Sequence, residues 1–386
     1  MRKIVILGST GSIGKSALDV VDNNPDKLQV VGLAAHTNYE QLTAQVAKYK
    51  PSHVTLTDKQ ALVSLKTQLA GSSVKVVEDS AFSNALEELS SLEDVDIVLN
   101  AIVGVIGLRA TAAALIAGKV VALANKESMV AAGPILNKLA LDHKGAIIPV
   151  DSEHSALYQC FLAGKHEQAR QLILTGSGGP FLNRPNLDGV TIEDALKHPN
   201  WVMGQKITID SATMMNKALE IIEAAYLFGI PGEKIKVMIH PQSIVHSMVE
   251  FIDGSVIAQM TQPDMRLPIQ YALLYPDRVP LEVCNIDWTK AMTLDFQPPD
   301  MTKFKSLSLG YRALKEGGIS PAVMNAANEV AVKAFLEGKI KFNRIYEIIE
   351  RVMDDIEAGE AGDLGSVYRA NMWASDLAED FVYAAL

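Results

Sequence analysis

A glycine-rich turn that directly follows an apolar run restricts this chain to a small set of folds. Ile4–Leu7 is wholly apolar, as a strand covered on both faces must be, and Gly8-Ser-Thr-Gly11-Ser-Ile-Gly14 comes straight after it. Gly8 would allow the tight turn, Gly11 would let the backbone approach a pyrophosphate, and Gly14 would let the next helix pack against the strand. The phosphate would then meet free N–H groups at the positive end of a helix dipole. The pattern predicts a dinucleotide-binding turn.

Up to about residue 150, short β-rich runs alternate with segments of helical spacing. The expected strands are Ile4–Leu7, Val30–Ala34, His53–Leu56, Val74–Val77, Ile97–Leu99, Val120–Ala122 and Ala146–Val150. The expected helices include Tyr39–Tyr49, Lys59–Leu69, Ala81–Leu89, Leu108–Ala117 and Pro134–His143. This alternation predicts βαβ units, and hence an α/β fold with a Rossmann-like, doubly wound parallel sheet in a cofactor domain at 1–150.

The rhythm changes after Val150, and a central α+β domain is expected at 151–286. Its expected elements are a strand at Leu172–Thr175, a helix at Ser211–Phe228, and a hairpin of Val245–Phe251 and Ser255–Met260 around Asp253-Gly254. The irregular segment at about 180–205 is too long for an ordinary loop, so it is predicted to be a functional flap.

The last part of the chain is expected to be a helical bundle. A proline-containing linker at 287–302 precedes it, and the bundle would occupy 303–386. The expected helices are Phe304–Lys315, Ala322–Leu336 and Ile345–Ala358. A chain of 386 residues exceeds the usual size of a single core, which agrees with several domains.

Composition argues against several classes of protein. The formal charge is −10 and no basic run could neutralise a nucleic-acid backbone. Cys160 and Cys284 are too far apart for a zinc spacing or a disulfide framework; we expect buried structural thiols in a reducing compartment. No stretch approaches the ~20 apolar residues of a membrane helix, and the first apolar run is too short for a signal peptide. We therefore expect a cytoplasmic protein without membrane or nucleic-acid partners.

Two further strand ends carry candidate cofactor contacts. After the second strand come His36, Thr37 and Asn38, with no carboxylate to repel a 2′-phosphate, which favours NADP over NAD. After the sixth strand comes Ala124-Asn-Lys-Glu-Ser128, at the sheet edge where such folds bind ligands. The local pattern is equally compatible with Asn125 as a helix cap and with Lys126 and Glu127 in solvent.

A pair of carboxylates follows the seventh strand. Asp151 and Glu153 are two residues apart, so in an extended chain they would point the same way. Two carboxylates aimed at one point need a cation or a proton between them, and oxygen ligands favour magnesium or manganese over zinc. Taken alone, the pair is also compatible with a surface turn.

A polar face interrupts the apolar helix expected to begin near Asp210. Its residues are Ser211, Thr213, Asn216, Lys217 and Glu220. Hydroxyls near a helix start, followed by an amide and an ammonium one turn on, would form a phosphate pocket. Glu220 could complete a metal site of three carboxylates. The alternative is a capped helix with an ordinary Lys217–Glu220 pair.

Together these residues resemble the 1-deoxy-D-xylulose 5-phosphate reductoisomerase family over essentially the whole chain, with the motifs in the family's order. The motifs are Gly8-Ser-Thr-Gly-Ser-Ile-Gly14, Ala124-Asn-Lys-Glu127, Asp151-Ser-Glu-His154, Thr175-Gly-Ser-Gly-Gly-Pro-Phe181, His198-Pro-Asn-Trp-Val-Met-Gly204, Asn216-Lys-Ala-Leu-Glu220 and His240-Pro-Gln-Ser-Ile-Val-His246. Seven coincident motifs are far more specific than any of them alone.

The resemblance implies an NADPH-dependent, metal-dependent oxidoreductase of the non-mevalonate isoprenoid pathway. It would convert 1-deoxy-D-xylulose 5-phosphate, a phosphorylated sugar, to 2-C-methyl-D-erythritol 4-phosphate. The chemistry would be a retro-aldol/aldol rearrangement templated by Mg²⁺ or Mn²⁺, followed by hydride transfer from NADPH. The resemblance also implies a homodimer.

The resemblance assigns roles residue by residue. The metal ligands would be Asp151, Glu153 and Glu220, which with Lys126 near the reacting oxygens form the catalytic set. The substrate would be held by Lys126, Ser152, Glu153, Ser177, His198, Ser211, Asn216, Lys217 and Glu220. NADPH would contact Thr10, Gly11, Ser12, Ile13, Asn38, Asn125, Glu127 and Gly204. Where the family often has Gly followed by Lys or Arg, this chain has His36 and Thr37, so the usual cation at the 2′-phosphate is missing.

The flap would exclude water while an aldehyde exists, with Trp201 over the substrate and Met203 beside the nicotinamide. A core aromatic is the alternative for Trp201, and His246 is expected either beside the site or as a structural histidine. Two other classes of protein share the glycine turn. Another NADP-linked dehydrogenase, of a phosphorylated or amino-acid-derived aldehyde, would not need three carboxylates, and a dinucleotide-sensing regulator would need a basic DNA-binding module.

Overall fold

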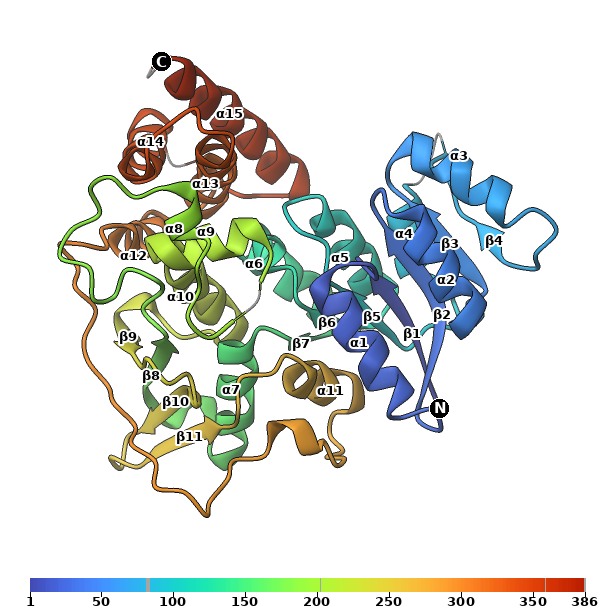
Figure 1. Cartoon of the computed structure of the whole chain (residues 1–386), viewed down its shortest axis with the longest axis horizontal. Helices are drawn as coiled ribbons and strands as arrows, with labels where there is room; N and C mark the ends of the chain where they lie inside the picture. Colours follow the sequence, from blue (N-terminus) through green and yellow to red (C-terminus); the bar gives the residue numbers. More distant parts are fainter. Residues whose placement is uncertain (81–83, 202, 358, 385–386) are drawn as a thin grey trace. The chain divides into compact units, whose positions relative to one another are not determined.

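The computed structural model describes residues 1–80, 84–201, 203–357 and 359–384, and Figure 1 traces its elements in chain order. The chain divides into two compact units. The first comprises Met1–Ser128, Leu136–Ser155 and Asp264–Glu282; the second comprises Met129–Ile135, Ala156–Pro263 and Val283–Leu386. In the described part of the chain, no helix is both long enough and apolar enough to span a bilayer.

A seven-stranded sheet forms the centre of the first unit. Its strands are β1 (Arg2–Leu7), β2 (Leu28–Ala35), β3 (His53–Leu56), β4 (Lys75–Val76), β5 (Ile97–Asn100), β6 (Val120–Leu123) and β7 (Ala146–Pro149). They lie in the order β4-β3-β2-β1-β5-β6-β7, and every neighbouring pair is parallel. The predicted Rossmann-like sheet is confirmed, because all seven expected strands are present.

Seven helices accompany this sheet among the described residues. They are α1 (Ser12–Asp22), α2 (Tyr39–Tyr49), α3 (Lys59–Gln68), α4 (Ala85–Ser90), α5 (Gly107–Ile116), α6 (Lys126–His143) and α11 (Arg266–Leu274). Residues 81–83 of the helix expected at 81–89 lie outside the described residues. No pattern in the sequence predicts that α11, from much later in the chain, belongs to this unit. It packs against α1 (Figure 1). Arg266 of α11 forms an ion pair with Asp19 of α1 at 2.9 Å.

The glycine turn lies where the strand order reverses, between β1 and β5. Ligands of open parallel sheets bind beyond the carboxyl ends of the strands at such a point. Gly8 has φ +85°, and a Cβ there would lie 2.5 Å from the carbonyl oxygen of Ala101, which follows β5. A Cβ on Gly14 would lie 2.3 Å from the Gly8 carbonyl oxygen. Both positions therefore require glycine for the close packing that the sequence predicts.

The second unit contains a mixed four-stranded sheet. Its strands are β8 (Ala169–Gly176), β9 (Ile235–Ile239), β10 (Val245–Phe251) and β11 (Val256–Met260), in the order β11-β10-β8-β9. The predicted hairpin is β10–β11, with Gly254 at φ +86° in its turn. β10 is antiparallel to β8, whereas β8 and β9 are parallel. This confirms a central α+β region.

The helix expected at 211–228 is two helices, and that prediction is wrong at its first turn. The observed helices are α9 (Gln205–Thr213) and α10 (Met215–Phe228), separated by Met214 at φ +61°. This left-handed conformation costs an ordinary residue roughly 1–2 kcal/mol. Met214 is 3 % exposed, and burial of its side chain offsets that cost. The break depends on tertiary packing, which local propensity does not reveal.

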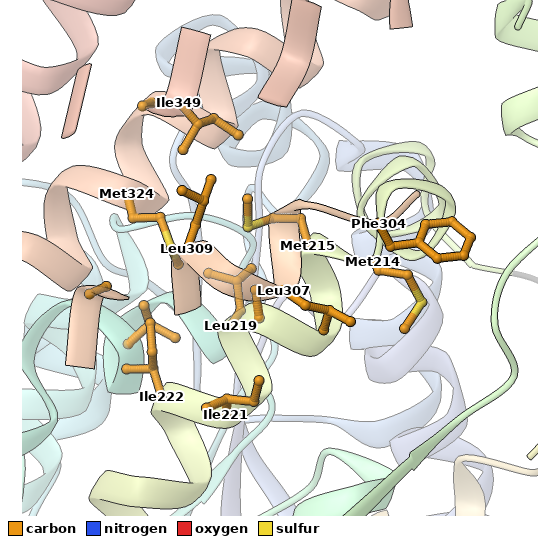
Figure 2. Packing of buried hydrophobic residues seen from close by; sticks show 14 of the residues in the cluster. Met214, Met215, Leu219, Ile221, Ile222, Phe304, Leu307, Leu309, Met324 and Ile349 are labelled. Atoms are coloured by element: carbon orange, nitrogen blue, oxygen red, sulfur yellow. The ribbon is translucent and has the colours of Figure 1, made fainter. Parts of the chain in front are cut away.

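The C-terminal helices share one apolar core with α10. They are α12 (Ser306–Glu316), α13 (Ser320–Leu336), α14 (Phe342–Asp355) and α15 (Leu364–Tyr383), and they confirm the predicted helical bundle. Residue 358, the last of the helix expected at 345–358, lies outside the described residues. Figure 2 shows side chains from α10, α12, α13 and α14, and from the residues just before α10 and α12, in this core: Met214, Met215, Leu219, Ile221, Ile222, Phe304, Leu307, Leu309, Met324 and Ile349.

The second unit also includes two short helices, one of which it shares with the first unit. α7 (Ser152–Cys160) begins in the first unit and ends in the second. α8 (Ile192–Ala195), capped by Thr191, is the one helix among the described residues of 180–204; residue 202 lies outside them. Both cysteines are buried and free, as expected, and burial raises the pKa of the Cys160 thiol to about 11.

Candidate active site

The glycine turn leaves a helix start open to an anion. α1 begins at Ser12 after Gly11, and no side chain within the described residues caps it. The first N–H groups of a helix have no partner inside the helix, so here they can face a phosphate. Thr10 and Ile13 are half-buried, while Gly11 and Ser12 are exposed. The backbone N–H groups at this helix start therefore lie at the switch point of the sheet, where a pyrophosphate would bind.

The residues after β2 are exposed, and they include an imidazole but no carboxylate. His36 Nδ1 lies 2.7 Å from the hydroxyl of Thr57, and Asn38 caps α2 by accepting the Gln41 N–H at 3.0 Å. His36, Thr37 and Asn38 are all exposed. A ligand phosphate here would meet an imidazole and neutral donors, without a carboxylate to repel it.

The sequence is compatible with two interpretations of the segment after β6: contacts to a cofactor, or a capped helix start with two charged residues in solvent. The structure agrees with each in part. Asn125 does cap α6, accepting the Ser128 N–H at 3.0 Å, and its amide also donates to the carbonyl oxygens of Ile102 and Gly104. The alternative that Lys126 and Glu127 are in solvent is wrong, because they are 7 % and 6 % exposed. Burial of two charged side chains at a ligand-binding sheet edge is costly unless they are paired, so it points to a functional site.

Lys126 forms an ion pair with Asp151, which follows β7. Burial alone would raise the pKa of the Asp151 carboxyl, but the charge of Lys126 and hydrogen bonding with His154 outweigh it. The net result is a pKa held well below the usual range, so the carboxylate is ionised.

Asp151 and Glu153 do converge, although not for the reason that the sequence suggested. The chain is not extended here: α7 begins at Ser152, so Asp151 immediately precedes a helix and Glu153 lies in its first turn. A carboxylate oxygen of Asp151 nevertheless lies within 4.8 Å of one of Glu153, and the Ser152 hydroxyl donates to Glu153. The surface-turn alternative is not supported, because both carboxylates are partly buried.

In the second unit, Glu220 is 1 % exposed and is held by two neighbours on α10. Lys217 binds its carboxylate at 2.5 Å, and the Asn216 amide donates to it at 2.6 Å. Lys217 also donates to the carbonyl oxygen of Thr175, near the end of β8, at 2.6 Å. The side-chain amide oxygen of Asn216 is buried and has no hydrogen-bond partner within the described residues. It could accept a hydrogen bond from a ligand hydroxyl.

The expected position of the two hydroxyl residues is corrected. Ser211 and Thr213 lie in the last turn of α9, not at a helix N-terminus. Thr213 is buried and donates to the backbone of its own helix, at Ile209 and Asp210. Ser211 is half-buried. The polar face thus extends across the α9–α10 break instead of along one helix.

Ser177 and His198 form a second polar cluster in this unit. His198 Nδ1 accepts the backbone N–H groups of Asn200 and Trp201, at 3.2 and 3.0 Å. The ring proton is therefore assigned to Nε2, which donates to the Ser177 hydroxyl oxygen at 3.0 Å. That oxygen also accepts the Gly179 N–H, so the Ser177 hydroxyl proton points elsewhere.

Trp201 and Met203, which are predicted from the sequence to lie in a flap, are half-buried, and Gly204 is exposed. Trp201 is therefore not the fully buried core aromatic considered above. Its ring lies 6.3 Å from that of His246, edge to face. His246 is itself buried and contacts the Thr261 carbonyl oxygen at 3.3 Å.

The structure thus groups the predicted residues into three clusters. Lys126, Asp151 and Glu153 meet in the first unit; Asn216, Lys217 and Glu220 meet in the second, as do Ser177 and His198. Sequence reasoning missed Asn100, a fully buried residue at the end of β5 whose amide donates to Gly107 and Thr111 and shapes the loop beside the glycine turn. A polar residue closing an apolar strand was the available signal.

A parallel sheet with a glycine turn at its switch point, followed by polar strand ends, defines a dinucleotide-binding α/β protein. Three family models specify it further. They describe 1-deoxy-D-xylulose 5-phosphate reductoisomerase (residues 4–133), its C-terminal domain (147–228) and the DXP reductoisomerase C-terminal domain (260–377). The chain belongs to the 1-deoxy-D-xylulose 5-phosphate reductoisomerase family.

Named relatives and solved structures agree over the full length. The reductoisomerase of Chlorobium chlorochromatii is 48% identical, covering 99% of this chain and 100% of the relative. That of Trichlorobacter lovleyi is 49% identical, covering 98% and 97%. The Zymomonas mobilis enzyme in complex with NADPH has a TM-score of 0.91 at 42% identity, covering 99% of both chains. A DOX-P reductoisomerase solved with NADPH, fosmidomycin and magnesium has a TM-score of 0.94 at 37% identity, covering 99% and 98%.

Proposed function

We propose that Asp151, Glu153 and Glu220 together hold the divalent metal of an NADPH-dependent reductoisomerase. As a member of its family, the chain converts 1-deoxy-D-xylulose 5-phosphate and NADPH to 2-C-methyl-D-erythritol 4-phosphate and NADP, in the non-mevalonate route to isoprenoids. The relatives solved with NADPH and with magnesium support both cofactors.

The available donors suit a hard cation. All three side chains offer carboxylate oxygens, which Mg²⁺ and Mn²⁺ prefer and which a zinc site would rarely use alone. Each buried carboxylate already has a cationic partner in its own unit, Lys126 for Asp151 and Lys217 for Glu220. For Asp151, the pKa of the carboxyl is held well below its usual range, which favours the ionised form that metal binding requires.

The observation that carries the substrate assignment is the cluster near the end of β8. Lys217 donates to Thr175, two residues before Ser177, and Ser177 contacts His198. An ammonium, a hydroxyl and an imidazole N–H near one strand end are the donors that a phosphate monoester needs. Ser211, Asn216 and Ser152 are proposed to complete the contacts to substrate.

The proposed chemistry is a retro-aldol/aldol rearrangement followed by reduction. When bound, the metal supplies Lewis-acid polarisation of the substrate oxygens and NADPH supplies the hydride. The residues of the chain orient and stabilise: Lys126, buried beside Asp151, is placed to stabilise developing negative charge on a substrate oxygen. The phosphate anchor uses remote binding energy to hold the reactive conformation.

The remaining assignments are proposed in the same way. NADPH would contact Thr10, Gly11, Ser12, Ile13, His36, Thr37, Asn38, Asn125, Glu127 and Gly204. Trp201 and Met203 would cover the site as part of a flap at about 180–205, which would exclude water. Functionally, 1–150 would serve the cofactor and 151–286 the substrate, with 287–302 linking to the bundle at 303–386.

The direct test offers the purified chain 1-deoxy-D-xylulose 5-phosphate with Mn²⁺ and follows NADPH oxidation. We expect turnover that stops on chelation and returns with Mg²⁺ or Mn²⁺. NADPH oxidation with this substrate that is insensitive to chelator would contradict the metal role, and no turnover at all would contradict the reaction. Repeating the assay with NADH measures how far His36 and Thr37 retain the preference for NADPH.

A homodimer is proposed on the second unit's sheet. β11 is an edge strand, and exposed apolar side chains lie on and beside it: Ile252 is 67% exposed, Val256 48% and Ile257 37%. An open edge with apolar side chains invites pairing with a second copy. Light scattering should give twice the chain mass, and Ile257→Lys should shift it towards the monomer.

Free, buried cysteines support a reducing, cytoplasmic location.

A further inference from the structure

A buried glutamine on α2, Gln45, forms two hydrogen bonds with one residue of the glycine turn, Ser9. Gln45 is 7 % exposed and Ser9 is fully buried. The Gln45 amide nitrogen donates to the Ser9 carbonyl oxygen at 2.9 Å, and its amide oxygen accepts the Ser9 hydroxyl at 2.7 Å. Both ends of one side-chain amide are therefore committed to one residue of the turn.

The other contacts of Ser9 complete a rigid attachment. The N–H groups of Gly8 and Ser9 both donate to the Ala34 carbonyl oxygen in β2, at 2.8 and 2.9 Å. With the Gln45 bonds, the N–H, carbonyl and hydroxyl groups of Ser9 each have a hydrogen-bond partner. Buried polar groups with all their partners specify one conformation, whereas loss of one partner leaves a costly orphan.

The orientation of the Ser9 carbonyl fixes the orientation of the next N–H. The peptide unit is planar and trans, so the Ser9 C=O and the Thr10 N–H point in opposite directions. By holding the carbonyl towards α2, Gln45 turns the Thr10 N–H away from α2. Thr10 is a candidate NADPH contact at the open start of α1.

The same helix begins at the other end of the candidate cofactor site. α2 starts directly after Asn38, which caps it, and Gln45 lies about two turns further on. One rigid helix therefore connects the residues proposed for the 2′-phosphate end with the turn proposed for the pyrophosphate. The Gln45–Ser9 contact therefore joins the two parts of the site through α2, in addition to the bonds that tie Gly8 and Ser9 to β2.

We propose that Gln45 is a positioning residue for NADPH, acting through Ser9 to direct the Thr10 N–H at the cofactor. The assignment rests on the proposed function for the identity of the cofactor only. Gln45 touches no reacting atom, so it governs cofactor affinity and leaves the chemical step and substrate binding alone.

The test compares Gln45→Met with Gln270→Met in the full-length enzyme. Methionine keeps the length and bulk of glutamine but neither donates nor accepts strongly. Gln270 is the matched control: it is 4 % exposed, lies in the same unit, and makes two comparable bonds, to Asn24 at 3.2 Å and Val279 at 3.1 Å. Neither of these two hydrogen bonds involves the glycine turn.

NADPH fluorescence without substrate gives the dissociation constant directly, so a failure of the proposed reaction would not obscure the result. We expect Gln45→Met to weaken NADPH binding about tenfold. The KM for the sugar phosphate and kcat at saturating NADPH should stay within about twofold, and Gln270→Met should bind NADPH as the wild type does. Similar losses of thermal stability in the two variants would show that the affinity change is not a folding effect.

Unchanged NADPH affinity in a folded Gln45→Met protein, or an equal loss in Gln270→Met, would overturn the proposal. Should Gln45→Met not fold, Gln45→Glu takes its place. Glutamate keeps the shape and the acceptor for the Ser9 hydroxyl but loses the donor to the Ser9 carbonyl. Weakened NADPH binding is again expected, and wild-type affinity again contradicts the assignment.

Discussion

Each of the two units contains a buried lysine–carboxylate pair, and the two pairs are built differently. In the first unit, Lys126 and Asp151 lie just beyond the ends of the adjacent parallel strands β6 and β7, with side chains 8 % and 16 % exposed. In the second, Lys217 and Glu220 are neighbours on one helix, 5 % and 1 % exposed, and Lys217 is also tied to the carbonyl of Thr175. The first pair follows from sheet topology, whereas the second follows from helical spacing, and its burial and its bond to Thr175 depend on how α10 packs. The comparison predicts different consequences when each pair is disturbed.

The largest effect is expected from Glu220→Gln. The amide keeps the shape but removes the charge that a metal requires, so kcat should fall roughly a thousandfold, since a Lewis acid contributes several kcal/mol and each 1.36 kcal/mol is tenfold in rate. NADPH affinity should not change, because the glycine turn belongs to the other unit. Steady-state kinetics with fluorescence binding measures both, and Glu233→Gln, at an exposed site of the same unit, is the control. Wild-type kcat in Glu220→Gln would refute its role as a ligand.

Lys217→Met should act mainly on KM. A charge-assisted bond to the substrate phosphate contributes about 1.5–3 kcal/mol, so KM should rise roughly 10- to 100-fold. The protein should also lose roughly 3 kcal/mol of unfolding free energy, because Glu220 is left buried without its cation. Lys126→Met should instead lower kcat with little change in KM. If both variants changed the same kinetic constant, the two lysines would not have the distinct roles assigned here.

The dependence of the second pair on the α9–α10 break can be tested at Met214. Met214→Ala should lower the unfolding free energy by about 2–5 kcal/mol through lost burial. Met214→Gly loses the same contacts but relieves the left-handed backbone, so it should be the more stable of the two by about 1 kcal/mol. Denaturant titrations give both values. A glycine variant less stable than the alanine variant would mean that the backbone conformation carries no cost.

The smallest effect concerns the first unit's cofactor selectivity. His36→Arg should raise the preference for NADPH over NADH about threefold, because an exposed guanidinium contributes only about 0.2–1 kcal/mol to an ion pair. The ratio of kcat/KM for the two cofactors measures it. His143→Arg, exposed in the last turn of α6, is a matched substitution that should leave the ratio unchanged. An unaltered ratio in His36→Arg would place the 2′-phosphate elsewhere.

The same contrast explains what sequence could predict. The glycine turn and the Asp253-Gly254 hairpin are local patterns with one structural solution, and both were found. The alternation of strands and helices predicted the parallel sheet, because buried strands and covering helices carry different periods.

The errors arose where distant packing decides the structure. Nothing in Met214-Met215 indicates a break, since methionine is a good helix former and the cause is the core in Figure 2. The start of α7 placed Glu153 on a helix that the strand pattern did not predict. The attachment of α11 to the first unit rests on contacts such as Arg266–Asp19, between residues remote in sequence.

The proposal that Asp151, Glu153 and Glu220 hold one divalent metal can be tested directly. Electron paramagnetic resonance of added Mn²⁺ measures bound ion per chain in the wild type, Asp151→Asn and Glu220→Gln. We predict one bound Mn²⁺ per wild-type chain and a large loss of affinity in both variants. Undiminished Mn²⁺ binding in either variant would contradict a shared site.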